Sequence, residues 1–205
     1  MEIFVWETEN HMQVNELNMD NKEAFQIFWQ DIIDKYRGFK IDFCFHNCDV
    51  PIDYMLEIKA TMLESCLETR LYPENYKPIS KHKLELVTED NFNEFANLHD
   101  KLNPAMYWTS ERIRNDFKKW LIYKHENNYV LMRLGVEIAE IYAVETNCPN
   151  LGKSLISEAV KSAIEAGKTS ILQMVDENNL TELEMVKAIG FSVCGTYIAY
   201  QTIVG

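Results

Sequence analysis

The sequence predicts an α/β protein with a mixed central β-sheet flanked by helices. Residues 136–145 alternate in polarity and are rich in Val, Ile and Tyr, which is typical of a strand. Residues 151–166 carry an apolar stripe with helical spacing, and residues 169–175 form a second apolar run. A strand, a helix and a strand in this order make a βαβ unit. We therefore expect two parallel strands with a right-handed crossover.

The N-terminal part of the chain is expected to open with a short strand at residues 2–7, followed by a polar loop at 10–18. A helix is expected over residues 21–36, with Asp20 as its N-cap. Residues 39–45 alternate between apolar and polar side chains, which predicts another strand.

A long helix is expected next, over residues 51–70, because Pro51 suits a first helical turn and an apolar stripe follows it. Residues 72–82 contain two prolines and no periodicity, so we place a boundary there. Residues 1–77 then form a β-α-β-α accessory segment, and residues 83–205 form the main domain.

Two readings of the accessory segment stay open. It is either a plain cap on the main sheet or a truncated, diverged relative of the main fold. The second reading notes that Gly38-Phe39 after a helix repeats Gly190-Phe191.

The main domain is expected to continue with helices and antiparallel strands before the βαβ unit. Thr88 is a candidate cap for its first helix, and Thr109 or Ser110 for its second. The expected elements are, in order, strand 83–87, helix 91–102, helix 111–119, strands 120–125 and 129–134, the βαβ unit, helix 180–189 and strand 193–204.

Composition limits the classes of function. The chain of 205 residues has a net charge of −12, which argues against binding to nucleic acid or to anionic membranes. No apolar run approaches the ~20 residues of a membrane span, and the N-terminus does not read as a signal peptide. Five scattered cysteines suggest reduced thiols, so a cytoplasmic location is expected. No metal site is expected, because the spacing of Cys44, His46 and Cys48 does not fit zinc.

The order of elements and a few residues carry a family resemblance. A strand leads into the loop Asn147-Cys148-Pro149-Asn150-Leu151-Gly152, which opens a helix, and Asn179 precedes a further helix that ends at Gly190-Phe191. This arrangement resembles the acyl-CoA-binding core of the GCN5-related N-acetyltransferases (GNAT). In that family the loop reads Arg/Gln-x-x-Gly-x-Gly/Ala. Here Gly152 matches the last position, while Asn147 and Asn150 replace the basic residue and the first glycine.

The resemblance implies an enzyme that transfers an acyl group from acyl-CoA, with acetyl-CoA as co-substrate, to an amine in one ternary complex. It implies that the main chain of Tyr142, Ala143 and Val144 binds the pantetheine arm. A helix N-terminus favours anions, so the pyrophosphate is expected at the loop. The loop residues expected there are Asn150, Leu151, Gly152, Lys153 and Ser154. The resemblance also implies that Asn179 binds pantetheine, with a helix N-cap as the equal alternative.

Candidates for proton transfer are less defined. Glu140 is a candidate base, because a half-buried carboxylate can have a raised pKa. The alternative is that Glu140 is an ordinary solvated or salt-bridged glutamate of the sheet. The resemblance implies an acid at position 186, where this chain has Val186. Tyr197 is the first substitute, with Tyr200 and Tyr142 as others, and each is otherwise a packed aromatic.

The acceptor is expected to be a small-molecule or peptide amine. Tyr107 and Trp108 lie in a loop where the resemblance implies an acceptor pocket, with a hydrophobic staple as the alternative role. The acidic composition favours a cationic amine, and a homodimer is compatible with an exposed sheet edge. The alternative function is a diverged module that binds acyl-CoA or a protein partner without turnover.

Overall fold

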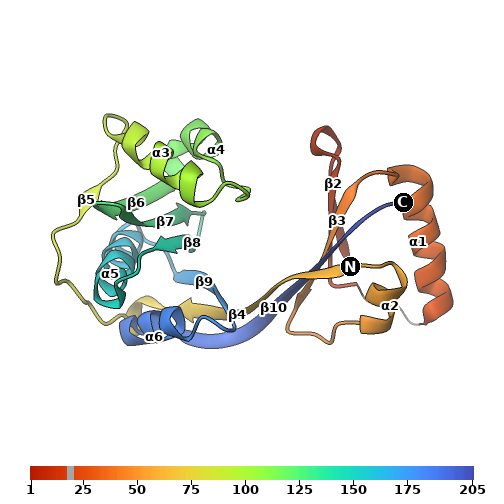
Figure 1. Cartoon of the computed structure of the whole chain (residues 1–205). Coiled ribbons are helices and arrows are strands. Elements are labelled where there is room, and N and C mark those ends of the chain that lie inside the picture. Colours follow the sequence, from red (N-terminus) through yellow and green to blue (C-terminus); the bar gives the residue numbers. More distant parts are fainter. Residues whose placement is uncertain (18–20) are drawn as a thin grey trace. The chain divides into compact units, whose positions relative to one another are not determined.

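The computed structural model describes residues 1–17 and 21–205, and it divides the chain into two compact units (Figure 1). Unit 1 contains Met1–Leu67 and Gly195–Gly205, and unit 2 contains Glu68–Cys194. Each unit has its own core, and each is described by itself below. Among the described residues, no helix combines the length and the apolar character needed to cross a bilayer.

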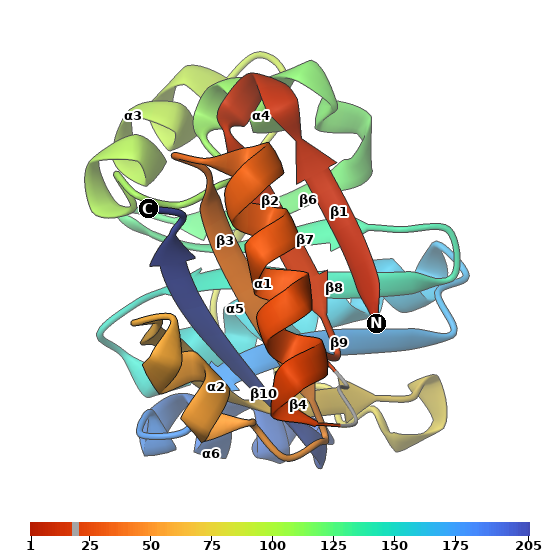
Figure 2. The ribbon, with the colours of Figure 1, turned by 90° about the vertical axis from the view of Figure 1, so that its right-hand side faces the viewer.

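Unit 1 is a sheet with strand order β1-β2-β3-β10-β4, covered by one long helix. Its elements are β1 (Glu2–Trp6), β2 (His11–Asn15), α1 (Lys22–Tyr36), β3 (Lys40–His46), α2 (Ile52–Glu57), the first part of β4 (Thr61–Leu71) and the second part of β10 (Ser192–Ile203). Strands β2 and β3 are parallel, and α1 runs along the face of both (Figure 2). Phe25 and Ile32 of α1 share a buried cluster with Phe43 and Phe45 of β3.

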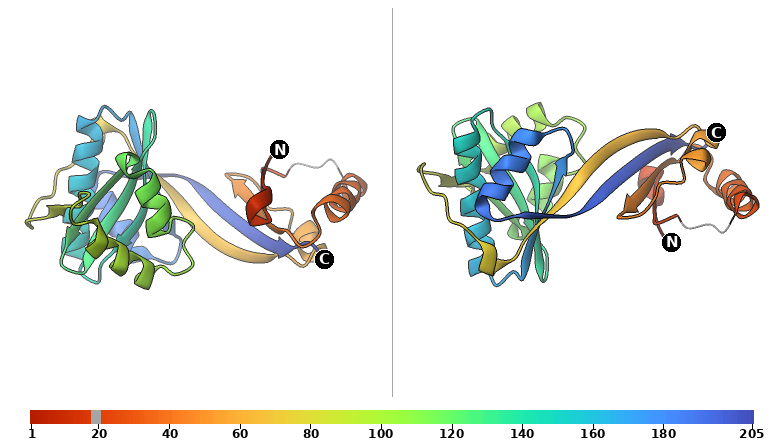
Figure 3. Two further views of the ribbon diagram at one scale, coloured as in Figure 1. Left: turned by 90° about the horizontal axis from the view of Figure 1, so that it is seen from above. Right: turned by 90° about the horizontal axis from the view of Figure 1, so that it is seen from below.

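Unit 2 is a sheet with strand order β4-β9-β8-β7-β6-β5 and helices on both faces (Figure 3). Its elements are the end of β4, β5 (Glu85–Leu86), α3 (Phe92–Leu102), α4 (Ser110–Asn115), β6 (Trp120–His125), β7 (Asn128–Leu134), β8 (Ile138–Glu145), α5 (Pro149–Glu165), β9 (Ser170–Asp176), α6 (Leu180–Ile189) and the start of β10. Strands β5 to β8 pair antiparallel, and β8 pairs parallel with β9 as predicted.

Two cores lie on the two faces of the sheet of unit 2. Helices α5 and α6 close the first core, which includes Leu155, Val160 and Val186. Helices α3 and α4 close the second core, which includes Phe95 and Ile113. The mixed sheet flanked by helices is the fold class that the sequence predicts.

Two sequence-based assignments in the N-terminal part are wrong. Residues 10–18 were expected to be loop, yet His11–Asn15 is strand β2, with Met12 and Val14 fully buried. The helix expected over residues 51–70 is the short helix α2 followed by strand β4. Lys59, between them, has a left-handed φ of 55°.

Helix caps differ from expectation at two places. Asp20 lies outside the described residues, and Asn21 caps α1 by accepting a hydrogen bond from the N–H of Ala24 at 2.9 Å. Helix α3 has Asn91 as its N-cap residue rather than Thr88. Thr109 caps α4 as predicted, since its side chain accepts from the N–H of Arg112.

The two units share the C-terminal strand and β4. The sequence placed all of residues 193–204 in the main domain, whereas the chain from Gly195 onward belongs to unit 1. Conversely, the last residues of β4 belong to unit 2, where the Thr69 hydroxyl donates to the carbonyl oxygen of Gln173 in β9 at 2.8 Å. The boundary therefore falls within two strands rather than in the proline-rich segment at 72–82.

The order of elements in unit 1 repeats that of the second half of unit 2. Both contain two antiparallel strands, a helix, a strand parallel to the second one, another helix and a final strand. By this order Gly38, after α1, corresponds to Gly167, after α5, and not to Gly190. Such a repetition is expected if unit 1 is a truncated, diverged relative of the main fold, and this origin stays a prediction.

Candidate functional site

The parallel strands β8 and β9 pair only along their first halves. Their register runs from Ile138 opposite Ser170 to Ile141 opposite Gln173. Strand β8 continues to Glu145 and β9 to Asp176 without further pairing between them. The edge of residues 142–145 that would face β9 therefore offers backbone donors and acceptors to a ligand.

A β-bulge lies at the point where the two strands part. Leu131 of β7 is opposite Ala143, while the next residue of β7 is opposite Ile141, so Tyr142 is the extra residue of β8. The bulge also changes the face of β8. Ile141 belongs to the core under α5, whereas Ala143 belongs to the core under α3 and α4.

The loop after β8 leads into α5, which begins at Pro149, earlier than predicted. The N–H of Gly152 donates to the carbonyl oxygen of Cys148 at 2.9 Å, so it is already part of the helix. The N–H groups of Asn150 and Leu151 precede this first helical bond, and Asn150 is exposed. These two amides are the donors that the helix N-terminus presents to an anion.

Two of the predicted loop residues also have structural roles, and their contact with the cofactor stays a prediction. A Cβ on Gly152 would overlap Sδ of Met185, so the glycine permits close packing of α5 on α6. Ser154 is buried, and its hydroxyl donates to the carbonyl oxygen of Asn150 at 3.1 Å and lies 3.1 Å from Nδ1 of His82. Lys153 is half-buried in the first turn of α5, where its cation remains a candidate phosphate contact.

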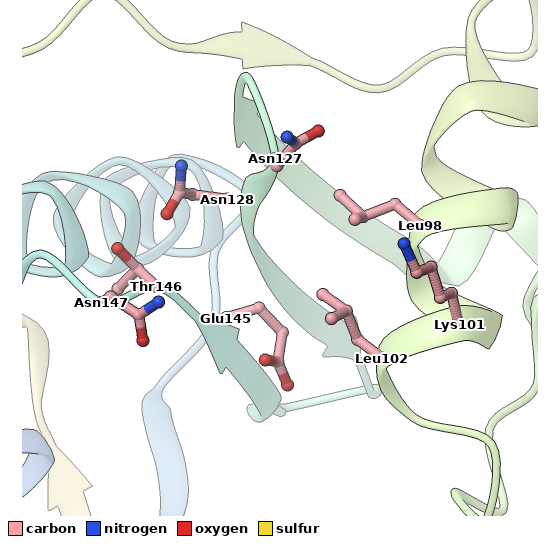
Figure 4. A pocket seen from close by; sticks show the side chains of 8 residues that line it. All are labelled: Leu98, Lys101, Leu102, Asn127, Asn128, Glu145, Thr146 and Asn147. Carbon is pink, nitrogen blue, oxygen red and sulfur yellow. The ribbon is translucent and has the colours of Figure 1, made fainter.

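A hollow of about 450 Å³ adjoins this loop (Figure 4). It is lined by Leu98, Lys101 and Leu102 from α3, by Asn127 in the turn before β7 and Asn128 at the start of β7, and by Glu145 at the end of β8 with Thr146 and Asn147 after it. Lys101 is the cation of this lining. The hollow therefore extends the loop with polar side chains, one positive charge from Lys101 and one negative charge from Glu145.

A row of three side chains crosses the face of the sheet opposite α5. In the strand register Trp120 of β6 is opposite Arg133 of β7, and Arg133 is opposite Glu140 of β8. Directly opposite residues project to the same face. The row lies toward α3 and α4, because the Arg133 guanidinium carbon is 4.9 Å from the centre of the Trp108 ring in the loop between those helices.

Glu140 is half-buried in this row and accepts a hydrogen bond from the hydroxyl of Tyr142 at 2.6 Å. Burial raises the pKa of the Glu140 carboxyl, although the bond from Tyr142 and the charge of Arg133 oppose the shift. The nearby carboxylate of Glu68 raises the pKa of Glu140 further. A carboxylate with a raised pKa is a better proton acceptor than an exposed glutamate.

Two tryptophan rings pack against Tyr142, the residue that holds the Glu140 carboxylate. The ring centroid of Trp108 lies 5.0 Å from that of Trp120 and 5.8 Å from that of Tyr142. The centroids of Trp120 and Tyr142 are 5.7 Å apart. Tyr107 is exposed, and the guanidinium carbon of Arg112 lies 3.9 Å from the centre of its ring. Trp108 also shares a core with Ile113 one turn into α4, which fits the staple role. The structure thus places Trp108 beside Glu140 and leaves Tyr107 at the surface.

Two other predicted residues, Asn179 and Tyr197, have defined partners, and Val186 is part of the core. Asn179 caps α6, since its Oδ1 accepts from the N–H of Glu182 at 3.1 Å and its Nδ2 donates to the Glu182 carboxylate at 2.7 Å. Val186 is fully buried in the core. Tyr197 lies in unit 1, with its hydroxyl 3.2 Å from Sγ of Cys44, and burial raises the pKa of Tyr197. Its predicted role as the acid remains a prediction.

Sequence reasoning missed Arg133 and Trp120. Each carries a buried N–H, Nε of Arg133 and Nε1 of Trp120, for which the described residues supply no acceptor. The only signal in the sequence is their place in the two antiparallel strands before β8. Their meeting with Glu140 depends on the register, which the sequence did not specify.

Comparisons with solved structures identify the fold. The chain aligns with a GCN5-related N-acetyltransferase from Sphaerobacter thermophilus over 98% of its own length and 76% of the other chain, with a TM-score of 0.66 and 11% identity. A GCN5-related N-acetyltransferase from Kribbella flavida gives a TM-score of 0.64 at 11% identity, with 93% and 80% of the two chains covered. A tandem GNAT protein from the clavulanic acid biosynthesis pathway gives 0.64 at 11% identity, with 96% and 76% covered.

The chain therefore has the GNAT fold, as the sequence resemblance predicted. At this level of identity the comparisons show the fold alone. Models of protein families and curated protein sequences give no match to this chain.

Proposed function

We propose that this protein is an acyl-CoA-dependent N-acyltransferase that uses acetyl-CoA and an amine acceptor. The observation that carries the proposal is the parting of β8 and β9 after Ile141, which leaves the backbone edge of residues 142–145 open. The pantetheine arm of coenzyme A contains amide groups, and such a chain can pair with an open strand edge. The fold of the solved neighbours supports the same activity.

The pyrophosphate of acetyl-CoA would lie at the N-terminus of α5. The free amides of Asn150 and Leu151 and the positive end of the helix dipole favour an anion there. Lys153 and Lys101 add positive charge near the same end of the helix and its hollow.

Glu140 is the base in this proposal. It removes a proton from the bound ammonium form of the acceptor, and the free amine then attacks the carbonyl carbon of the thioester. A new C–N bond forms and the C–S bond breaks, and the second proton lost by the nitrogen passes to the leaving sulfur, so coenzyme A leaves as the thiol. Tyr142 holds the Glu140 carboxylate through its hydroxyl, and the rings of Trp108 and Trp120 exclude water from it.

Acetyl-CoA binding and turnover test this function separately. Thermal unfolding is measured with and without millimolar acetyl-CoA, and thiol release is measured with a panel of amines. A ligand at a hundredfold excess over its Kd stabilises the native state by about 2.7 kcal/mol. A higher Tm with amine-dependent thiol release supports the proposal. A shift without turnover of any amine would indicate a binding module, and no shift would overturn both functions.

A further inference from the structure

The charge of Arg133 acts on the Glu140 carboxyl opposite it, but the guanidinium makes no direct ion pair within the described residues. It lies half-buried over Trp108, and the described residues hold no carboxylate within ion-pair distance of it. Its Nε–H is buried and finds no acceptor. A half-buried cation with an unsatisfied donor is costly, so the Nε–H of Arg133 calls for a further partner such as a water molecule, an ion or a ligand.

A second unsatisfied donor lies beside Arg133 in the same row. Trp120 is opposite Arg133 in the strand register, and its indole Nε1–H is also buried without an acceptor. On the other side of Arg133, Glu140 has one carboxylate oxygen bound by Tyr142. The row therefore presents donors and a positive charge next to a carboxylate.

We propose that the acceptor is a small amino acid, whose carboxylate binds Arg133 and Trp120 while its ammonium group lies at Glu140. This inference rests on the proposed N-acyltransferase function and specifies its substrate class. The charges of Arg133 and Glu140 are the complement of a zwitterion. The Cβ atoms of directly opposite residues on neighbouring strands lie ~5 Å apart, so Arg133 and Glu140 start close together. An acceptor that contacts both therefore needs its amine and its carboxylate close together, as in an α- or β-amino acid.

Recognition of a carboxylate by a guanidinium gives discrimination as well as affinity. A bidentate arginine–carboxylate pair is among the stronger charge-assisted hydrogen-bonded contacts. Without the carboxylate, the two buried donors stay unsatisfied in the complex, so an amine of the same size is a poorer substrate. Arg133 is thus a specificity-determining residue, and Glu140 retains the role of base.

The test compares acceptors that differ only in the carboxylate. Thiol release from acetyl-CoA is followed with the common amino acids and β-alanine. Each acid that is acetylated is then compared with its carboxamide, and alanine is compared with ethylamine. We expect the acid to exceed its carboxamide at least tenfold in kcat/KM, measured at pH values where both amines have the same free-base fraction.

The variant Arg133→Met identifies the residue responsible. It keeps an unbranched side chain against Trp108 and removes the positive charge. The ratio of kcat/KM for the amino acid to kcat/KM for ethylamine is expected to fall at least tenfold, because the effect of the lost charge on the pKa of Glu140 is common to both acceptors. Arg114→Met is the matched control, because the Arg114 guanidinium carbon also lies over a ring, 4.6 Å from the centre of Phe92. This control should leave both acceptors unchanged.

Binding gives a readout that is independent of turnover. Trp108 and Trp120 flank Arg133, so their fluorescence should change on titration with the amino acid, and this change should disappear in Arg133→Met. If carboxylate-free amines are acetylated as well as the acids, the amino-acid inference is wrong and the N-acyltransferase function stands. If no amino acid alters the fluorescence, the inference is also wrong. Absence of acetyl-CoA binding would instead remove the function itself.

Discussion

At the residue scale, Glu140 gives the most direct test of catalysis. Glu140→Gln keeps the shape of the side chain and removes the base, so kcat/KM for the acceptor should fall about a hundredfold or more. Burial raises the pKa of Glu140, and the base works only when it is ionised. Activity of the native protein should therefore be lost as the pH falls through this raised pKa.

The pH profile separates this role from a structural one. The acceptor amine also loses its free base as the pH falls, so the native protein and Glu140→Gln are compared with the same acceptor. In the plot of activity against pH, the variant should lack the decrease caused by protonation of the Glu140 carboxyl. It should retain the decrease caused by protonation of the acceptor amine. Identical profiles for the two proteins would show that another group is the base.

The second prediction at the residue scale concerns the stability cost of replacing Gly190. Gly190 ends α6 with φ of 112°, and a Cβ there would overlap the carbonyl oxygen of Asn75. Gly167 has a similar φ of 79° but faces open space. Gly167→Ala should cost about 1 kcal/mol of the free energy of unfolding for its backbone conformation, and Gly190→Ala about 2–4 kcal/mol because the overlap is added. Urea unfolding of both variants checks the difference, and equal costs would contradict it.

The sequence identified some site residues and missed others for a physical reason. Glu140 stood out as a carboxylate in an apolar strand, Tyr142 as a residue of the same strand, and Trp108 as one of two adjacent aromatics in a loop. Arg133 and Trp120 did not, because one arginine or tryptophan in a strand is unremarkable until the register shows its neighbours. Gly152 matched a motif position, yet its structural reason is the packing against Met185.

At the scale of elements, the N-terminus of α5 can be tested without damaging the fold. Asn150→Asp places a negative charge in the exposed first turn, where the helix dipole stabilises it by about 0.3–1 kcal/mol. The same charge repels a pyrophosphate. We expect an unchanged or higher Tm for the free protein and loss of the shift that acetyl-CoA produces.

Asn150→Gln is the neutral control and should keep the acetyl-CoA shift. Gly152→Asp is a poorer choice, because any side chain there collides with Met185 and confuses lost binding with lost stability. If Asn150→Asp binds acetyl-CoA as tightly as the native protein, the phosphates lie elsewhere, for example at the hollow beside Lys101.

The elements that the sequence predicted well are those whose local pattern and final packing agree. Helix α5 and strands β6 and β7 are of this kind, since their apolar spacing matches the faces they bury. Strand β4 was taken for helix because Pro51 suits a first helical turn and the apolar stripe from Met55 to Leu67 has helical spacing. Pairing within the sheet overrides that local pattern, as it often does.

At the scale of the whole molecule, strands β4 and β10 are each divided between the two units. This division decides which fragments of the chain can fold alone. A division by linker composition assigns residues 83–205 to an independent domain. The strand order of unit 2 instead requires the end of β4 beside β9, where Thr69 bonds to Gln173 and Leu71 is fully buried. Such a dependence is invisible in the sequence because it joins segments about a hundred residues apart.

A fragment of residues 83–205 should therefore unfold at lower urea concentration than the full chain, with a smaller m-value, or fail to fold. It lacks the buried side chains of Thr69 and Leu71, and its last strand loses the partner β3 of unit 1. A fragment of residues 68–205 restores the end of β4 and should recover part of the loss. If the shorter fragment unfolds cooperatively at the same midpoint as the full chain, the shared strands contribute nothing to unit 2. The division drawn from the linker would then be the better one.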